Sequence, residues 1–251
     1  MQFPTVSVLN IPFINTTNQA FIAQLSKDLA ANENRFIVTA NPEIALYATK
    51  HNDYFQTISQ ADYITPDGIG ILKGATMLGT PLTERITGFD TMTALFEIAN
   101  QNSYSIYLLG AKEEVLQAAC QNVAKQYPNV TIVGQHNGYF DDQEEQKIVA
   151  DIERTQPNII LAALGFPKQE TFIEANHHKV NAIWMGVGGS FDVLSGTVSR
   201  APKIWQKMHL EWFYRFASHP SRLNRFQRLL NTCNLLRNLK NNLNTVSSHL
   251  K

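Results

Sequence analysis

Short apolar runs alternate along the chain with stretches in which apolar residues recur at helical spacing. The runs are five to seven residues long and predict strands at 5–10, 36–40, 61–65, 104–110, 130–134, 158–164 and 182–187. Helical patterns between them predict helices over about 18–32, from near Pro42, and near 88–101. Several runs are apolar throughout, which is typical of strands buried on both faces of a parallel sheet. We therefore predict an α/β fold with a Rossmann-like, mostly parallel sheet flanked by helices, and with ligands outside the carboxyl ends of the strands.

The pattern changes after Arg200, where strands give way to helical spacing alone. Pro202 suits the first turn of a helix. Apolar residues then recur at helical spacing at Trp205, Met208, Trp212 and Phe216. The stretch 218–221 breaks this helix, and a second one is expected over about 222–243. The sequence thus predicts an α/β domain over residues 1–199 and a basic helical appendage over 200–251.

The charge distribution supports this division. The formal net charge of the 251 residues is zero, but residues 1–199 carry 11 lysines and arginines against 20 acids, a net of −9. Residues 200–251 carry 10 basic residues and one acid, a net of +9. An asymmetry of this size indicates different partners for the two parts, such as an anionic surface for the basic one.

Cysteine content and hydropathy bear on the cellular compartment. Two cysteines, Cys120 and Cys233, give no disulfide framework and no metal-site spacing, which fits a reducing cytoplasm. The amino terminus lacks the basic region and cleavage site of a signal peptide, so we read it as mature protein. No apolar run approaches the roughly 20 residues that span a bilayer, so any membrane contact is expected at the surface.

Polar residues stand where two predicted strands end. Thr39 and Asn41 follow the strand at 36–40, and Asn41 has two interpretations: a ligand contact, or an N-cap of the helix that begins at Pro42. Asp67 follows the strand at 61–65 in the tripeptide Pro-Asp-Gly. It is either an ordinary turn residue or a general base that takes a proton from a hydroxyl nucleophile.

Further candidates lie at the other strand exits. Arg85 offers a planar fork of donors suited to phosphate, although a single arginine is more often a solvated surface charge. Gln169 and Lys168 follow one apolar strand, and Gly188 and Gly189 follow another. Consecutive glycine N–H groups before a helix suit an anion, but glycine equally permits tight packing. The segment LLGAKEE at 108–114 is a weak phosphate loop, because it lacks the full G-x-G-x-x-G pattern.

The sequence lacks the usual signs of a metal or cofactor site. There is no P-loop and no D-x-D motif. The acids of FDDQEE at 140–145 suit the start of a helix, and the adjacent His177 and His178 would face different directions. We therefore expect neither an essential metal nor a cofactor.

Taken together, these segments resemble the WecG/TagA/CpsF family of bacterial glycosyltransferases. The matching motifs are TANPE, ADYITPDGIGI, RITGFD, YLLGA, LGFPKQE, GVGGSFDVLSGTVSRAPK and EWFYRFASHPSRLNRF, from residue 39 to about 228. The resemblance is greatest to the teichoic-acid branch. It implies metal-independent, inverting transfer of N-acetylmannosamine from a UDP donor to N-acetylglucosaminyl-diphospho-undecaprenol, which forms the linkage unit of wall teichoic acid.

The resemblance also implies roles for individual residues. Asp67 matches the proposed general base, and Thr39 and Asn41 match positions that line the same pocket. Arg85 and Gln169 match positions implicated in binding donor or acceptor. The appendage residues Arg215, Arg222 and Arg225 match arginines proposed to reach the lipid diphosphate.

The resemblance implies a cytoplasmic enzyme held peripherally at the inner face of the membrane by its basic appendage, with a homo-oligomer as an open possibility. One alternative is the same chemistry with another UDP-sugar, such as a glucose or N-acetylmannosaminuronic acid donor. Another is a non-catalytic nucleotide-binding protein whose basic tail binds nucleic acid. The full set of motifs favours the enzyme and gives no reason to expect a nucleic-acid partner.

Overall fold

The computed structural model describes residues 3–199, Pro202 and Trp205. Its strands are β1 (Thr5–Val8), β2 (Ile11–Ile14), β3 (Arg35–Ala40), β4 (Tyr63–Pro66), β5 (Ser105–Gly110), β6 (Thr131–His136), β7 (Ile159–Ala163) and β8 (Ile183–Gly186). Its helices are α1 (Asn18–Ala30), α2 (Pro42–Lys50), α3 (Asn52–Ser59), α4 (Ile69–Met77), α5 (Gly88–Asn102), α6 (Glu113–Gln126), α7 (Asp142–Thr155), α8 (Lys168–Asn176), the 3-10 turn η1 (His177–Lys179) and α9 (Ser190–Leu194).

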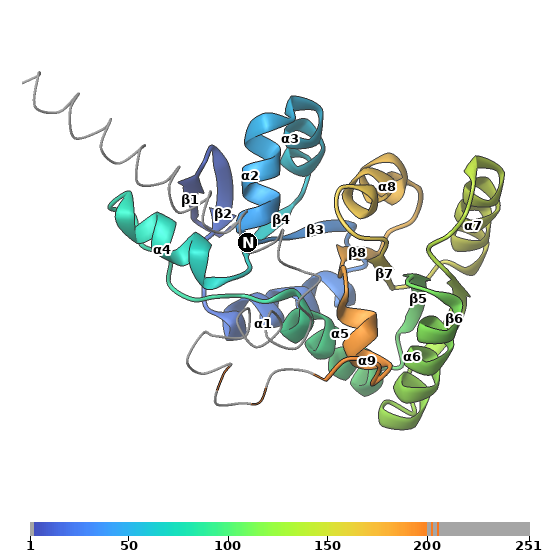
Figure 1. Cartoon of the computed structure of the whole chain (residues 1–251). Helices are drawn as coiled ribbons and strands as arrows, with labels where there is room; N and C mark the ends of the chain where they lie inside the picture. The colour runs from blue at the N-terminus through green and yellow to red at the C-terminus, as the bar shows by residue number, and fades with distance from the viewer. Residues whose placement is uncertain (1–2, 200–201, 203–204, 206–251) are drawn as a thin grey trace, which may run out of the picture.

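Six strands form one parallel sheet in the order β4-β3-β8-β7-β5-β6. Helices α2, α3, α7 and α8 cover one face, and α1, α5, α6 and α9 cover the other (Figure 1). The predicted α/β fold with a parallel sheet between helical layers is confirmed. The apolar runs predicted all six of these strands to within two residues at nearly every end, because strands buried on both faces have little room for polar side chains.

The first predicted strand is confirmed over Thr5–Val8, but its expected place among the parallel strands is wrong. Residues 5–8 do not join the parallel sheet; they pair antiparallel with 11–14 in a separate two-stranded hairpin. The hairpin turns at Leu9 and Asn10, which both adopt positive φ values of 55° and 65°. Two consecutive residues of this kind give the type I′ geometry that suits a two-residue hairpin loop. Leucine is an unusual choice there, so the sequence carried no clear hairpin signal.

Three other segments differ from the prediction or lie outside the described residues. The helix from Pro42 ends at Lys50, and a second helix, α3, starts at Asn52. The Pro-Asp-Gly turn leads directly into α4. The predicted appendage over 200–251, with Arg215, Arg222 and Arg225, lies outside the described residues except for Pro202 and Trp205, so that domain division stays a prediction.

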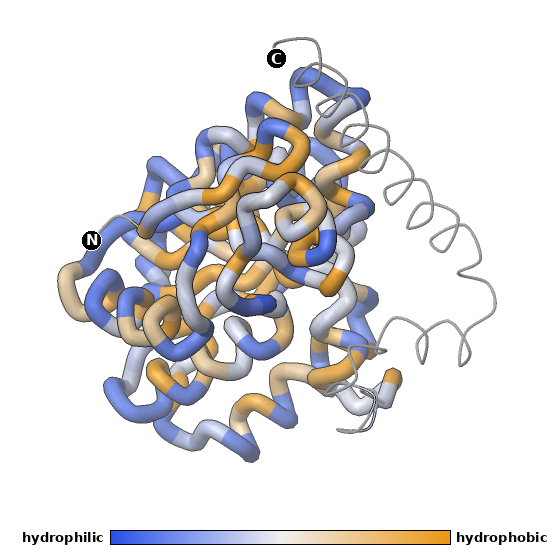
Figure 2. The backbone as a smooth tube through the Cα atoms, turned by 90° about the vertical axis from the view of Figure 1, so that its left-hand side faces the viewer, coloured by the Kyte–Doolittle hydropathy of each residue, from blue (hydrophilic) through white to orange (hydrophobic). Residues whose placement is uncertain are grey.

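The core lies on both faces of the sheet. In β5, Tyr107 and Leu109 pack against the layer that contains α7 and α8, whereas Ile106 and Leu108 pack against the layer that contains α5 and α6. Hydrophilic stretches lie mainly toward the outside of the body (Figure 2). Among the described helices, none combines the length and the apolar character that crossing a bilayer requires.

A buried polar network anchors the amino ends of β3 and β4. The carboxylate of Asp28, which is 2% exposed, accepts hydrogen bonds from Gln24 and from the Tyr63 hydroxyl, both at 2.8 Å. Arg35 Nε lies 3.2 Å from Asp28 Oδ2. Burial, reinforced by Asp28, raises the pKa of Tyr63 to about 12, so the hydroxyl remains a donor at neutral pH. This network holds in place the two strands whose opposite ends carry Thr39 and Asp67.

Candidate active site

The predicted polar residues converge on the carboxyl edge of β3, β4 and β8. These three strands are neighbours in the sheet. The helix after β3 packs on one face and the helix after β8 packs on the opposite face. Adjacent strands whose connections leave to opposite faces create a crevice at their carboxyl ends, where open α/β sheets bind ligands.

Asp67 lies at the end of β4 and contacts the start of α5. Its backbone N–H donates to the carbonyls of Ala40 (3.1 Å) and Thr65 (3.0 Å), which fixes the residue beside the end of β3. Its Oδ2 accepts a hydrogen bond from the Gly88 N–H at 3.2 Å. This N–H belongs to the first residue of α5, whose positive end favours a charged carboxylate. Asp67 is half-exposed at this end of the sheet.

Glycines on either side explain the local Pro-Asp-Gly sequence. Gly68 has φ of +99°, a left-handed conformation that favours glycine. A Cβ on Gly70 would come within 2.6 Å of Pro42 Cγ, so α4 and α2 approach closely only because that side chain is absent. The segment is therefore a tight turn as well as a candidate catalytic element, and the two interpretations are compatible.

Thr39 and Asn41 serve the framework at the end of β3. The Thr39 hydroxyl donates to the Gly186 carbonyl at 3.4 Å, across to β8. Asn41 Oδ1 accepts from the N–H groups of Glu43 (2.9 Å) and Ile44 (3.0 Å), which confirms the N-cap interpretation. Because the oxygen caps the helix, the Asn41 side-chain NH2 is directed elsewhere, and it donates to none of the described residues. It is available to a ligand.

The RITG segment lies alongside the end of β4. The Ile86 N–H donates to the Pro66 carbonyl at 3.1 Å, which brings the segment beside Asp67. Arg85 is half-exposed in this segment. Thr87 caps α5 by accepting from the Asp90 N–H at 3.1 Å. The structure therefore brings Arg85 to the same end of the sheet as Thr39, Asn41 and Asp67.

Gln169 is buried, with both ends of its amide bonded within the protein. It is 4% exposed at the start of α8. Its Nε2 donates to Glu170 Oε1 at 2.7 Å, and its Oε1 accepts from the Gly188 N–H at 3.0 Å. A Cβ on Gly186 would lie 2.5 Å from Gln169 Nε2, so this glycine is needed for close packing. In this conformation, Gln169 shapes the turn after β8, with one amide N–H and the amide oxygen engaged inside the protein; its predicted contact with a ligand stays a prediction.

The N–H groups after β8 are mostly engaged inside the protein. Val187 donates to Ala162 O at 2.9 Å, Gly188 to Gln169, and Ser190 to Val187 O at 3.1 Å. A nest of several free N–H groups is therefore not formed here. Gly189 N–H donates to none of the described residues and is the group of this turn that a ligand can use.

Glu170 is a site residue that the sequence did not reveal. It is 1% exposed, and its Oε2 completes no hydrogen bond. The neighbouring polar group is the buried Tyr54 hydroxyl on α3, which interacts electrostatically with Glu170. Like Glu170 Oε2, this hydroxyl lies outside ordinary hydrogen-bond geometry with any described group. Burial raises the pKa of Glu170 to about 7, against the opposing effects of the Gln169 hydrogen bond and of Tyr54. Pro-Lys-Gln-Glu reads as an exposed helix start, so no sequence signal marked this carboxyl group as buried.

The weak phosphate-loop candidate at 108–114 serves packing. A Cβ on Gly110 would lie 2.4 Å from the backbone of Ala163, so the glycine allows the ends of β5 and β7 to approach. Glu113 accepts hydrogen bonds from Gln117 and Asn137 on the surface. Nothing in this segment joins the crevice around Asp67.

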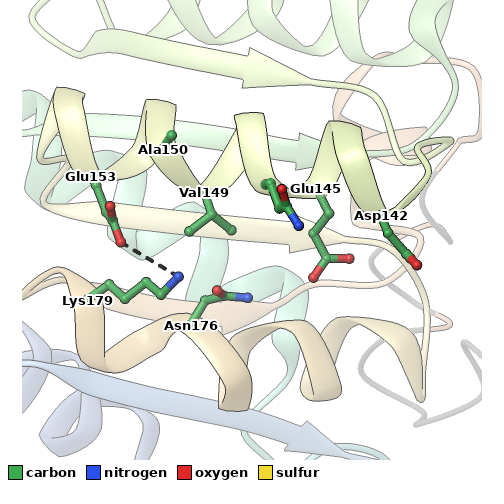
Figure 3. A pocket seen from close by; sticks show the side chains of 8 residues that line it. Asp142, Glu145, Val149, Ala150, Glu153, Asn176 and Lys179 are labelled. Atoms are coloured by element: carbon green, nitrogen blue, oxygen red, sulfur yellow. Dashed lines mark ion pairs between the residues drawn. The ribbon is translucent and has the colours of Figure 1, made fainter.

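A groove of about 350 Å³ runs between α7 and the end of α8 (Figure 3). It is lined by Asp142, Glu145, Gln146, Val149, Ala150, Glu153, Asn176 and Lys179. Its one cation, Lys179, lies 3.7 Å from Glu153 in an ion pair. Three carboxylates against one paired lysine do not suit an anionic nucleotide, so this groove is a poor candidate for the site.

Within the described part of the chain, no three His, Cys, Asp or Glu residues form a metal-binding cluster; metal independence stays a prediction.

Comparison with known proteins identifies the family of this chain. The family model described as "Glycosyl transferase WecG/TagA/CpsF family" matches residues 6–247. A Bacillus subtilis (strain 168) protein is 38% identical over 223 residues, covering 88% of this chain and 86% of the relative. A Staphylococcus aureus (strain MW2) protein is 39% identical over 228 residues, covering 89% of each. Both relatives are named N-acetylglucosaminyldiphosphoundecaprenol N-acetyl-beta-D-mannosaminyltransferase. The chain belongs to the WecG/TagA/CpsF family of glycosyl transferases.

Proposed function

We propose that this protein transfers N-acetylmannosamine from UDP-N-acetylmannosamine to N-acetylglucosaminyl-diphospho-undecaprenol, in the synthesis of the wall teichoic acid linkage unit. The observation that carries the proposal is the identity of 38–39% across nearly nine tenths of the chain to relatives with that activity in their names. The half-exposed carboxylate at the carboxyl edge of the sheet supports it, because such a transfer needs a base beside an open crevice.

In the proposed mechanism, Asp67 is the general base. A hydroxyl of the acceptor sugar attacks the anomeric carbon of the donor, and its proton passes to the Asp67 carboxylate. The new oxygen–carbon bond forms as the bond from the anomeric carbon to the β-phosphate oxygen breaks, and UDP leaves with the electron pair. Attack from the side opposite the leaving group inverts the anomeric configuration. The Gly88 N–H holds Asp67 in place through its Oδ2.

The leaving diphosphate needs cations and N–H donors that stabilise its negative charge. We assign this role to Arg85, the Asn41 side-chain NH2 and the Gly189 N–H within the described body. Arg215, Arg222 and Arg225 would add to it from the appendage. Preorganised donors of this kind stabilise developing negative charge without a metal ion.

The proposed acceptor is lipid-linked, which gives the basic segment 200–251 a use. Each lysine or arginine near an anionic leaflet contributes about 1 kcal/mol. We propose that this segment holds the enzyme peripherally at the inner face of the cytoplasmic membrane.

The decisive experiment combines the purified full chain with a lipid-diphosphate N-acetylglucosamine acceptor and one UDP-sugar at a time. We expect mass spectrometry to detect one added N-acetylhexosamine from UDP-N-acetylmannosamine, with or without EDTA. Transfer from UDP-glucose instead would assign another donor. No transfer from any UDP-sugar, while UDP still binds, would contradict the enzymatic proposal.

A further inference from the structure

Two consecutive buried polar residues at the start of α8 lie directly behind the turn that follows β8. Gln169 bridges Glu170 Oε1 and the Gly188 N–H, at 2.7 Å and 3.0 Å. An amide can present either its oxygen or its NH2 to the Gly188 N–H, and only the oxygen can accept the bond. The orientation of the Gln169 amide therefore decides whether the Gly188 N–H is held.

Glu170 settles that orientation. Its Oε1 accepts the Gln169 Nε2–H bond and so directs the amide oxygen toward Gly188. Among the elements that pack on α8, the strands β3, β7 and β8 present apolar side chains on this face of the sheet, such as Val38, Ile160 and Trp184. The remaining polar neighbour is the Tyr54 hydroxyl on α3. No other described group competes for Gln169 Nε2.

The held turn has a particular shape. Gly188 has φ of +51°, and its N–H points inward to Gln169. The next N–H, that of Gly189, then remains at the start of α9 without a described partner. If the Gln169 amide turned over, its NH2 would face the Gly188 N–H, donor against donor, and the turn would lose its hydrogen bond at Gly188.

We propose that Glu170 is a positioning residue of the transfer reaction: it orients the Gln169 amide, and through it the turn at 187–189 that receives the donor diphosphate. The diphosphate part rests on the proposed function; the positioning part does not. Glu170 is 1% exposed and interacts with Gln169 and with the Tyr54 hydroxyl. Taking a carboxyl group out of water costs stability, so its presence behind this turn indicates a role beyond packing.

The test separates positioning from general packing with four variants at Gln169 and Glu170 and one control variant, all in the full chain. Glu170→Met removes the acceptor at similar volume, and Glu170→Gln restores a carbonyl acceptor. Gln169→Met removes the bridge, and the double variant combines Glu170→Met with Gln169→Met. The packing control is Phe172→Leu, which changes a buried apolar side chain of the same helix. Glu170→Ala replaces Glu170→Met if the latter does not fold.

Two readouts are measured: hydrogen exchange of the Gly188 amide, and the Kd for UDP by calorimetry. We expect faster Gly188 exchange and an about tenfold weaker Kd in Glu170→Met, with both restored in Glu170→Gln. Because Glu170 acts through Gln169, the double variant should bind UDP no more weakly than Gln169→Met. Phe172→Leu should lower the melting temperature and leave both readouts unchanged.

The outcomes distinguish the two proposals. Equal Gly188 protection in wild type and Glu170→Met, or additive losses in the double variant, would overturn the positioning role. A wild-type protein that does not bind UDP would overturn the proposed donor, while faster exchange in Glu170→Met alone would still support the positioning of the turn.

Discussion

Asn41 is predicted to have two separable functions, one for each atom of its side-chain amide. Its oxygen accepts two hydrogen bonds, at 2.9 and 3.0 Å, from the first turn of α2. Its NH2 group has no partner among the described residues and is proposed to contact the donor diphosphate. Asn41→Ala loses both atoms, whereas Asn41→Asp keeps a capping oxygen and loses the donor.

The expected stabilities follow from the cap. Removing a side-chain cap costs about 1–2 kcal/mol, which for a chain of this size lowers the melting temperature by about 2–4 °C per kcal/mol. Asn41→Ala should show this loss. Asn41→Asp should be at least as stable as wild type, since a carboxylate at a helix N-terminus contributes about 0.3–1 kcal/mol.

The expected activities follow from the donor. A hydrogen bond to a charged group contributes about 1.5–3 kcal/mol, so both variants should lose at least about tenfold in kcat/KM for the UDP-sugar. Asn41→Asp should lose more, because its charge faces the diphosphate. The assays are thermal unfolding and initial transfer rates over a range of donor concentrations.

A matched control comes from α7. Asp141 Oδ1 accepts from the N–H groups of Gln143 and Glu144 at 3.0 and 2.9 Å, nearly the geometry of the Asn41 cap. It follows β6, four strand spacings from β3, or about 19 Å. Asp141→Ala should lose similar stability and keep its activity. Wild-type kcat/KM in Asn41→Asp, or an equal activity loss in Asp141→Ala, would refute the assigned donor role.

Three further predictions follow from the site and the charge pattern. Asp67→Asn should fold normally and lower kcat by about 10²–10⁴ in the transfer assay; near-normal turnover would remove Asp67 as the base. Deleting residues 202–251 should weaken binding to anionic vesicles by about a hundredfold or more in flotation assays and lower activity with it, whereas unchanged behaviour in both assays would contradict the membrane role. Burial raises the pKa of Glu170 to about 7, so folding is favoured while this carboxyl is neutral, and this contribution is lost as pH rises from about 4.5 to 7. In urea unfolding, Glu170→Gln should gain about 2–3 kcal/mol over wild type between pH 5 and pH 8. An equal gain in the half-exposed control Glu174→Gln would contradict burial as the cause.

The sequence predicted those parts of the fold that depend on local pattern. Continuous apolar runs located the strands of the parallel sheet, and polar residues at their ends located Thr39, Asn41 and Asp67 at one edge. The hairpin was missed because Leu9 and Asn10 adopt left-handed conformations, and neither is the glycine that usually marks a two-residue hairpin turn in a sequence. Whether residues 5–8 pair locally with 11–14 or join the main sheet depends on the packing of the folded chain, which strand propensity does not encode.

The Gln169–Glu170 pair was missed for a different reason. Polar residues after a proline predict an exposed helix start, and in isolation that is the better interpretation. Their burial depends on the missing side chain of Gly186, against which Gln169 packs at a distance that no Cβ would allow. It also depends on α3, which closes over Glu170 with Tyr54. Neither neighbour is close in sequence, so only the folded chain reveals the buried carboxyl group.

The charge asymmetry between the two parts of the chain bears on how a diphosphate is bound. Residues 1–199 carry a net charge of −9 and residues 200–251 a net charge of +9, so the body as a whole repels the proposed donor and the lipid diphosphate. Attraction within the body must then be local, from groups at the crevice such as Arg85 and the positive ends of helices that begin there, including α2 and α5. The remaining neutralisation is assigned to the basic segment. On this argument, the body alone should bind UDP weakly and with little salt dependence, and the basic segment should add an affinity that falls steeply as ionic strength rises.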